Sequence, residues 1–240
     1  GGPLRMSDTL LEEYIVQHIE ASPGPLVSFS WHGGEPTLLG LDYFRKITTL
    51  QRKYRLPGQT IRNGIQTNGT LLDEDWCRFF AEEGFGVGIS IDGPDNLHDR
   101  YRLSKKKEST HKRVMHGYKL LMQYQIPHDV LCVVHAHNGR HPVEVYRFCR
   151  EIGARAIGFL PLVEHNPDNN NLSKRTVPSD AFGHFLCSIF DEWLSSDAGR
   201  IYVQIIDEVA RTALGQEHGL CVFRKTCGDV PLRFQTFSGP

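Results

Sequence analysis

The sequence lacks a long apolar run, an excess of charge of either sign and any low-complexity segment. Its 240 residues carry 27 lysines and arginines against 28 aspartates and glutamates, a formal net charge of −1. A near-neutral chain gives no electrostatic reason to expect nucleic acid or an acidic lipid surface as a partner. No apolar run approaches the roughly 20 residues that span a membrane, and no signal peptide is visible. We therefore expect a soluble cytoplasmic protein without membrane contact.

The chain has six cysteines. Four of them fall inside apolar helix or strand patterns, where a free cysteine acts as a small buried hydrophobe, so we expect them in the core. These four are Cys77, Cys132, Cys149 and Cys187. The other two, Cys221 and Cys227, lie near the end of the chain, outside any long periodic run.

Apolar patterns with a period of two alternate along the chain with patterns of helical period. Strands are expected at 26–31, 61–67, 87–92, 130–134 and 156–160. Helices are expected between and after them, from one capped by Ser7 or Asp8 to one at about 202–214. This alternation predicts an α/β fold with parallel strands and outer helices. Because the chain opens with a helix, a barrel-like sheet would need one more strand before it.

Alternation within the strands separates an apolar from a polar face. In the strand at 87–92, the valine and two isoleucines share one face, while Ser90 and Asp92 lie on the other. The apolar faces would contact the helices, and the polar faces would line a ligand cavity. The alternative is a polar core that is hydrogen-bonded internally. In barrels of this kind the site lies at the C-terminal ends of the strands.

The most informative motif follows the first predicted strand, in the run Trp-His-Gly-Gly-Glu-Pro-Thr-Leu. Gly33 and Gly34 allow a backbone to approach a ligand closely. The acid behind them, Glu35, can accept hydrogen bonds from an amine, and Pro36 fixes the exit of the turn. A ligand with an amino-acid end would suit this turn.

Two further strand ends carry polar motifs, Gln-Thr-Asn-Gly-Thr-Leu-Leu-Asp at 66–73 and Gly-Ile-Ser-Ile-Asp-Gly-Pro at 88–94. In this order and spacing, the three motifs resemble the radical S-adenosylmethionine (SAM) enzymes. Within these, they resemble the anaerobic sulfatase-maturating enzymes, which carry a SPASM-type C-terminal region. The resemblance runs from about Met6 to Cys227.

The resemblance implies a partial parallel (β/α)6 TIM-like radical SAM barrel whose first strand and cluster loop are missing. Residues 1–165 would form this partial barrel and residues 166–215 its C-terminal helices. Residues 216–240 would begin an auxiliary iron–sulfur region that is truncated.

The resemblance also implies a site for S-adenosylmethionine. The matching residues are Gly33, Gly34, Glu35, Pro36, Ser90, Arg102 and Val163. The turn would bind the methionine amino group, with Gly34 as the backbone contact. Ser90 would face the ribose or the carboxylate, and Arg102 would pair with the methionine carboxylate, which suits a planar guanidinium. Val163 would contact the adenine through its backbone.

Three further residues, His32, Gln66 and Asn68, would face a substrate peptide. Structural roles compete with these functional ones. Glu35 could serve only as a helix cap and Arg102 as a surface arginine. Ser90 could be a polar core residue and His32 a structural histidine.

The departures from the family concern iron–sulfur ligands. The family's Cys-x3-Cys-x2-Cys motif, which holds the radical-generating 4Fe-4S cluster, is not present, so we expect those ligands outside this chain. Cys221 and Cys227 match the start of the auxiliary-cluster region, where thiolates suit the metal. The later cysteines and the catalytic aspartate are absent, and the tail from Gly228 does not resemble the family. We assign no catalytic residue and expect this fragment alone to be inactive.

The implied function of the complete protein is that of an oxidoreductase that converts a cysteine or serine of a sulfatase to formylglycine. Its cofactors would be S-adenosylmethionine and 4Fe-4S clusters. Its partners would be the sulfatase polypeptide and an electron donor such as ferredoxin or flavodoxin. Two alternatives stay open: a radical SAM/SPASM enzyme that modifies another peptide, and a non-catalytic barrel module that has lost its clusters.

One other cluster has a spacing that zinc could use. His135, His137 and His141 form His-x-His-x3-His after a strand. No acidic or cysteine partner accompanies them, and a chain with 12 histidines offers such spacings by chance. We therefore expect no zinc there.

Overall fold

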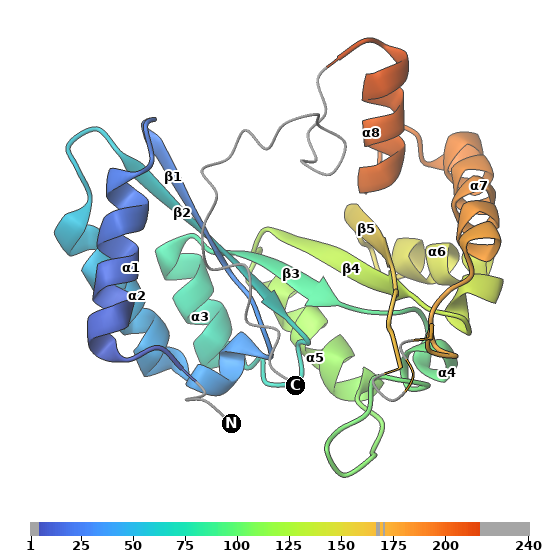
Figure 1. The fold of residues 1–240 in the computed structure, drawn as a ribbon, viewed down its shortest axis with the longest axis horizontal. Coiled ribbons are helices and arrows are strands. Elements are labelled where there is room, and N and C mark those ends of the chain that lie inside the picture. The colour runs from blue at the N-terminus through green and yellow to red at the C-terminus, as the bar shows by residue number, and fades with distance from the viewer. Residues whose placement is uncertain (1–4, 167–168, 170, 217–240) are drawn as a thin grey trace.

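The computed structural model describes residues 5–166, 169 and 171–216. Six parallel strands form one sheet and pair in chain order (Figure 1). They are β1 (Leu26–Trp31), β2 (Thr60–Thr67), β3 (Gly86–Ser90), β4 (His128–Val134), β5 (Ala156–Pro161) and β6 (Tyr202–Val203). Within the described residues no strand pairs with the outer edge of β1, and β1 does not pair with β6. The predicted α/β fold with an open, partial barrel is thus confirmed.

Helices connect the strands, as a parallel sheet requires. The α-helices are α1 (Asp8–Glu20), α2 (Leu41–Tyr54), α3 (Glu74–Glu83), α4 (Asp95–His98), α5 (His111–Gln123), α6 (Pro142–Glu151), α7 (Ser179–Ser196) and α8 (Gln204–Ala213). Two 3₁₀ turns, η1 (Pro36–Leu39) and η2 (Asn138–Arg140), follow β1 and β4. No helix in the described part of the chain is long and apolar enough to cross a membrane.

Local sequence signals fix the helix ends. The Ser7 hydroxyl accepts a hydrogen bond from Leu10 N at 3.2 Å and caps α1. The Asp73 carboxylate caps α3 in the same way, through Trp76 N at 2.9 Å. Gly84 ends α3 in the left-handed conformation, with φ of 66°. The cap predicted at Ser7 or Asp8 is therefore confirmed at Ser7.

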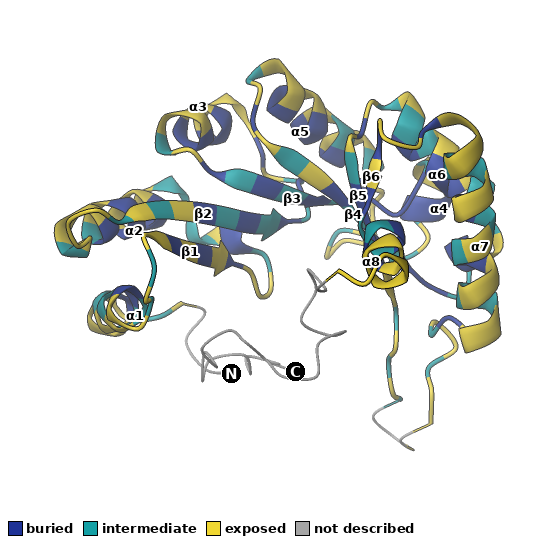
Figure 2. Ribbon diagram, turned by 90° about the horizontal axis from the view of Figure 1, so that it is seen from above, coloured by how far each residue is buried: buried dark blue, intermediate teal, exposed yellow. Residues whose placement is uncertain are grey.

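The strands follow an arc with α3 and α5 on its convex side (Figure 2). Their apolar faces are buried against the helices, as Val27, Phe29 and Trp31 of β1 illustrate, while Ser28 and Ser30 are exposed. Aromatic rings fill the space between β1, α2 and α3, where Phe44 meets Trp76 at 5.4 Å between centroids. Burying each such ring contributes roughly 1.5–3 kcal/mol. The polar faces therefore remain free to line the concave side.

Three sequence-based expectations need correction. The strand predicted at 87–92 ends at Ser90. A sixth strand, β6, follows β5 along the chain and was not predicted, because two residues are too few to show a periodic pattern. Cys187 is exposed, although Cys77, Cys132 and Cys149 are buried as expected. In α7 the buried residues Phe185 and Ile189 lie on one face of the helix, and Cys187, midway between them, lies on the opposite face and is exposed. The division at 165 and 215 stays a prediction.

Candidate functional site

The turn after β1 has a backbone that only glycine adopts readily. Gly33 has φ of 106° and Gly34 φ of 56°. A Cβ built on either glycine would meet no atom within 4 Å. The glycines are therefore required by conformation rather than by crowding. The exposed peptide groups of the turn are open to a ligand.

Glu35, the acid of this turn, is tied to the end of β2. Its Oε1 accepts hydrogen bonds from Thr37 N at 3.1 Å, Thr37 Oγ1 at 2.6 Å and Thr67 Oγ1 at 2.6 Å. Its Oε2 accepts one from Asn68 N at 2.7 Å. The carboxylate thus caps η1 and also links two strand ends, which leaves only Oε2 with spare capacity for a ligand amine.

The next contact joins β2 to β3. Gln66 Nε2 donates a hydrogen bond to Ser90 Oγ at 3.1 Å. The Gln66 side chain crosses over Gly88, where a Cβ would lie 2.0 Å from Gln66 Oε1. The missing side chain at 88 therefore makes room for this contact. Asn68 behaves differently, because its Oδ1 accepts from Thr70 N at 2.9 Å and stabilises the turn.

Arg102 forms a two-point ion pair with Asp92, just past the end of β3. Its Nε lies 2.5 Å from Asp92 Oδ2, and its Nη2 lies 3.0 Å from Asp92 Oδ1. The aspartate side chain is 3% exposed and that of the arginine 23%. Val133 N also donates to Asp92 Oδ1 at 2.9 Å, so the carboxylate is held by β4 as well.

Two buried neutral histidines lie at the same edge of the sheet. Burial lowers the pKa of His98 to about 4 and that of His135 to about 4. His98 Nδ1 accepts from Asp92 N at 3.3 Å, and His135 Nδ1 accepts from Asn138 N at 3.2 Å. His135 Nε2 is buried without a hydrogen-bond partner. These rings support the loops after β3 and β4.

The predicted site residues are therefore partly brought together. Hydrogen bonds connect the turn to β2, β2 to β3, and Asp92 to Arg102. His32 and Val163 stand apart: both are exposed, and no side-chain contact within the described residues joins them to the others. Cys221 and Cys227 lie outside the described residues. Asp92 was expected on the polar face of its strand, but its pairing with Arg102 was not predicted, although its place in Asp-Gly-Pro, ten residues before Arg102, was a usable signal.

A cavity of about 380 Å³ lies at the opposite end of β5, between α6 and α7, and is lined by residues such as Arg150, Arg155 and Arg200. No group of three or more histidine, cysteine or acidic side chains is arranged to hold a metal ion in the described ranges. His141 pairs with Glu144 at 3.1 Å. That the three clustered histidines do not bind zinc stays a prediction.

Comparison with known proteins places this geometry in a family. The family described as the radical SAM superfamily matches residues 3–149, more than half of the chain. The chain belongs to this superfamily.

Within it, the chain is similar to anaerobic sulfatase-maturating enzymes. The serine-type enzyme of Bacteroides thetaiotaomicron is 39% identical over 237 residues, which cover 93% of this chain and 57% of that protein. The cysteine-type enzyme of Clostridium novyi is 31% identical, over 83% of this chain and 54% of its own length. The chain spans just over half the length of these relatives.

Solved structures agree. The structure of native anSMEcpe with bound AdoMet and Kp18Cys peptide has a TM-score of 0.81 and 32% identity, and covers 90% of this chain and 60% of that one. The structure of Streptococcus suis SuiB, at 14% identity and a TM-score of 0.58, shares the fold.

Proposed function

We propose that this chain is the cofactor-binding part of a radical SAM oxidoreductase that oxidises a cysteine or serine of a sulfatase to formylglycine. The observation that carries the proposal is the agreement in sequence and fold with sulfatase-maturating enzymes over nine tenths of the chain. The hydrogen bonds from the glycine turn to β2, from β2 to β3 and from Asp92 to Arg102 support it, because they lie at the motifs that suggested it. The protein would act in the cytoplasm on a sulfatase polypeptide, with ferredoxin or flavodoxin as electron donor.

The described residues fit S-adenosylmethionine. The open peptide groups of Gly33 and Gly34 suit the amino group of its methionine part. Ser90 Oγ and the unpaired N–H groups of Arg102 suit the hydroxyls and the carboxylate. When bound, the cofactor would supply the radical that removes a hydrogen atom from the target residue. The chain's own part is to bind and orient it. Replacing Arg102 by alanine should cost roughly 1.5–3 kcal/mol of binding free energy.

The described residues do not fit a 4Fe-4S cluster. Burial raises the pKa of the Cys77 thiol to about 11 and that of Cys149 to about 12, so these thiols stay protonated. Cys132 is buried as well, and Cys187 lies alone on α7. Cluster ligands need thiolates grouped together. These four cysteines therefore do not suit the binding of a 4Fe-4S cluster.

The test uses the full-length protein after anaerobic reconstitution with iron and sulfide. It is incubated with S-adenosylmethionine, a reductant and sulfatase peptides that carry cysteine or serine at the target position. Mass spectrometry should find formylglycine in the peptide, together with 5′-deoxyadenosine. An Arg102→Ala variant should lose most of this activity. An Arg147→Ala variant, whose partner Glu192 lies on α7, should keep it.

The outcomes separate the candidate functions. Formation of 5′-deoxyadenosine with an unchanged sulfatase peptide would indicate a radical SAM enzyme with another target. No 5′-deoxyadenosine from correctly reconstituted full-length protein would contradict the proposal and favour a non-catalytic barrel. The present 240 residues alone should yield none under the same conditions.

A further inference from the structure

Asp92 is a buried carboxylate at the mouth of the sheet that no assigned role explains. We propose that Asp92 is the positioning residue that orients Arg102 toward the carboxylate of S-adenosylmethionine. The inference rests on the proposed function, because that function supplies the ligand. Asp92 itself touches only protein groups. It therefore acts through Arg102.

The geometry of the ion pair decides which part of the guanidinium is free. Arg102 has five N–H donors, and the contacts with Asp92 engage Nε and Nη2. Three N–H groups remain, two on Nη1 and one on Nη2. Because the guanidinium is planar, these three lie on the edges away from Asp92. One further carboxylate can bind them, and no described residue occupies them.

Asp92 is fixed more firmly than an ordinary partner of a surface arginine. Its Oδ1 accepts from Val133 N of β4, and its main-chain oxygen accepts from Asn138 Nδ2 at 3.1 Å. Its own N–H donates to the buried ring of His98. Three separate elements thus determine where the carboxylate lies. A side chain held in this way can set the direction of its partner.

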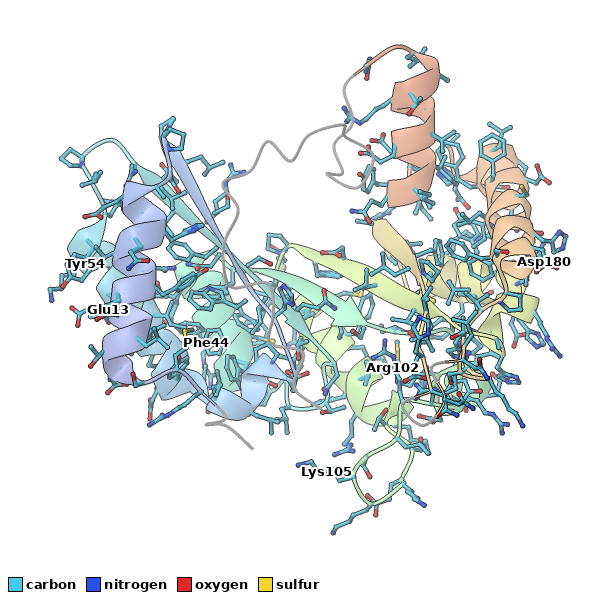
Figure 3. All side chains as sticks on the ribbon, viewed as in Figure 1. Glu13, Phe44, Tyr54, Arg102, Lys105 and Asp180 are labelled. Atoms are coloured by element: carbon cyan, nitrogen blue, oxygen red, sulfur yellow. The ribbon has the colours of Figure 1, made fainter. Side chains whose placement is uncertain are left out.

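The main chain of Arg102 is held as well. Thr110 Oγ1 donates to Arg102 O at 2.5 Å, and His98 Nε2 lies 3.3 Å from the same hydroxyl. Both ends of the arginine are therefore fixed, while its guanidinium stays 23% exposed. Figure 3 shows Arg102 near α4, on the side from which the loop with Lys105 projects. An arginine fixed at both ends loses less conformational freedom when it binds a ligand.

The test compares two ligands that differ in one group. Equilibrium dialysis of the full-length protein measures the affinity for S-adenosylmethionine and for decarboxylated S-adenosylmethionine. In an Asp92→Asn variant the amide can still accept from Val133 N, but its NH2 faces an N–H of Arg102. We expect roughly a tenfold loss of affinity for S-adenosylmethionine. The affinity for the decarboxylated analogue should stay unchanged.

A matched control is present between α6 and α7. Arg147 and Glu192 form a pair of the same geometry, with Nε–Oε1 at 2.7 Å and Nη2–Oε2 at 3.0 Å. A Glu192→Gln variant breaks that pair and should leave both affinities unchanged. Circular dichroism and urea unfolding establish that each variant is folded.

Other outcomes overturn the inference. If Asp92→Asn alters neither affinity, or lowers both equally, Asp92 does not position Arg102 for the carboxylate. If Asp92→Asn does not fold, Arg102→Lys is decisive, because an ammonium cannot form the two-point pair. If the Arg102→Lys variant prefers S-adenosylmethionine over the decarboxylated analogue as strongly as the wild type does, the inference is refuted. If the wild type and the Arg102→Ala variant discriminate equally between the two ligands, the assignment of Arg102 in the proposed function is refuted instead.

Discussion

Glu35 offers the sharpest test of how the glycine turn is built. Its carboxylate accepts four hydrogen bonds, two from Thr37 within the turn and two from Thr67 and Asn68 at the end of β2. A Glu35→Ala variant removes all four acceptor contacts. Thr67 is 1% exposed, so its hydroxyl would remain buried without that partner. The turn would then no longer be held against β2.

The magnitude follows from these contacts. A hydrogen bond to a charged group contributes roughly 1.5–3 kcal/mol, but four such values do not add, because they share one side chain. Asn68 is half-buried, so its N–H can bind water after the change, whereas Thr37 is 3% exposed. We therefore expect Glu35→Ala to lower the free energy of unfolding by about 2–3 kcal/mol. Glu35→Gln keeps one carbonyl oxygen and should lose about half of that.

Urea unfolding of the chain, followed by circular dichroism, measures the difference. An Asp42→Ala variant is the control, because Asp42 is 96% exposed and pairs only with Arg45 on the surface of α2. Its removal should change the free energy of unfolding by less than about 0.5 kcal/mol. A Glu35→Ala variant that is no less stable than this control would refute the cross-link.

Three further predictions concern other parts of the chain. Gly117→Ala should destabilise by about 1–3 kcal/mol, because its Cβ would lie 2.7 Å from Gly69 O. A Cβ at Gly183 on α7 would meet no atom within 4 Å, so Gly183→Ala should stabilise the chain by about 0.5–1 kcal/mol. If the two variants have equal effects in urea unfolding, the close contact with Gly69 O is refuted. The lowered pKa of His98 means that the unfolded chain binds the extra proton first as pH falls below about 6.5. His98 should therefore account for a loss of about 2 kcal/mol between pH 7 and pH 5, and a His98→Gln variant whose stability falls as steeply as that of the wild type would contradict this. Replacing Cys221 and Cys227 by alanine in the full-length protein should lower the iron content per chain; unchanged iron would exclude them as auxiliary-cluster ligands.

The sequence was sufficient to predict which segments meet at the functional edge. Parallel strands carry their C-terminal ends to one edge, so motifs that follow β1, β2 and β3 must be neighbours there. The alternation of Val87 and Ile89 with Gly88 and Ser90 correctly separated the buried face from the polar one. These features depend on short-range periodicity, which a single sequence displays directly.

The partners of the polar side chains could not be predicted in the same way. The contact between Gln66 and Ser90 depends on register, which aligns Gln66 with Gly88. The pair of Asp92 with Arg102 depends on the path of the loop that contains α4. The buried amides of Gln51 on α2 and Asn63 on β2 form two hydrogen bonds with each other, at 2.8 Å and 2.9 Å. Nothing in the two sequence segments indicates this pairing. Hydrogen-bond partners that are distant in sequence are fixed only by the assembled fold.

The cross-links at the functional edge form an unbroken series along four strands. Glu35 joins β1 to β2, Gln66 joins β2 to β3, and Asp92 joins β3 to β4 through Val133 N. Each uses a side chain of one strand end and a group of the next, so in the proposed function the groups for the two ends of the methionine part would be set before any ligand arrives. Preorganisation of this kind reduces the entropy lost on binding. After β5, Val163 is 63% exposed. The edge is therefore built most firmly where the ligand's charged groups would be held.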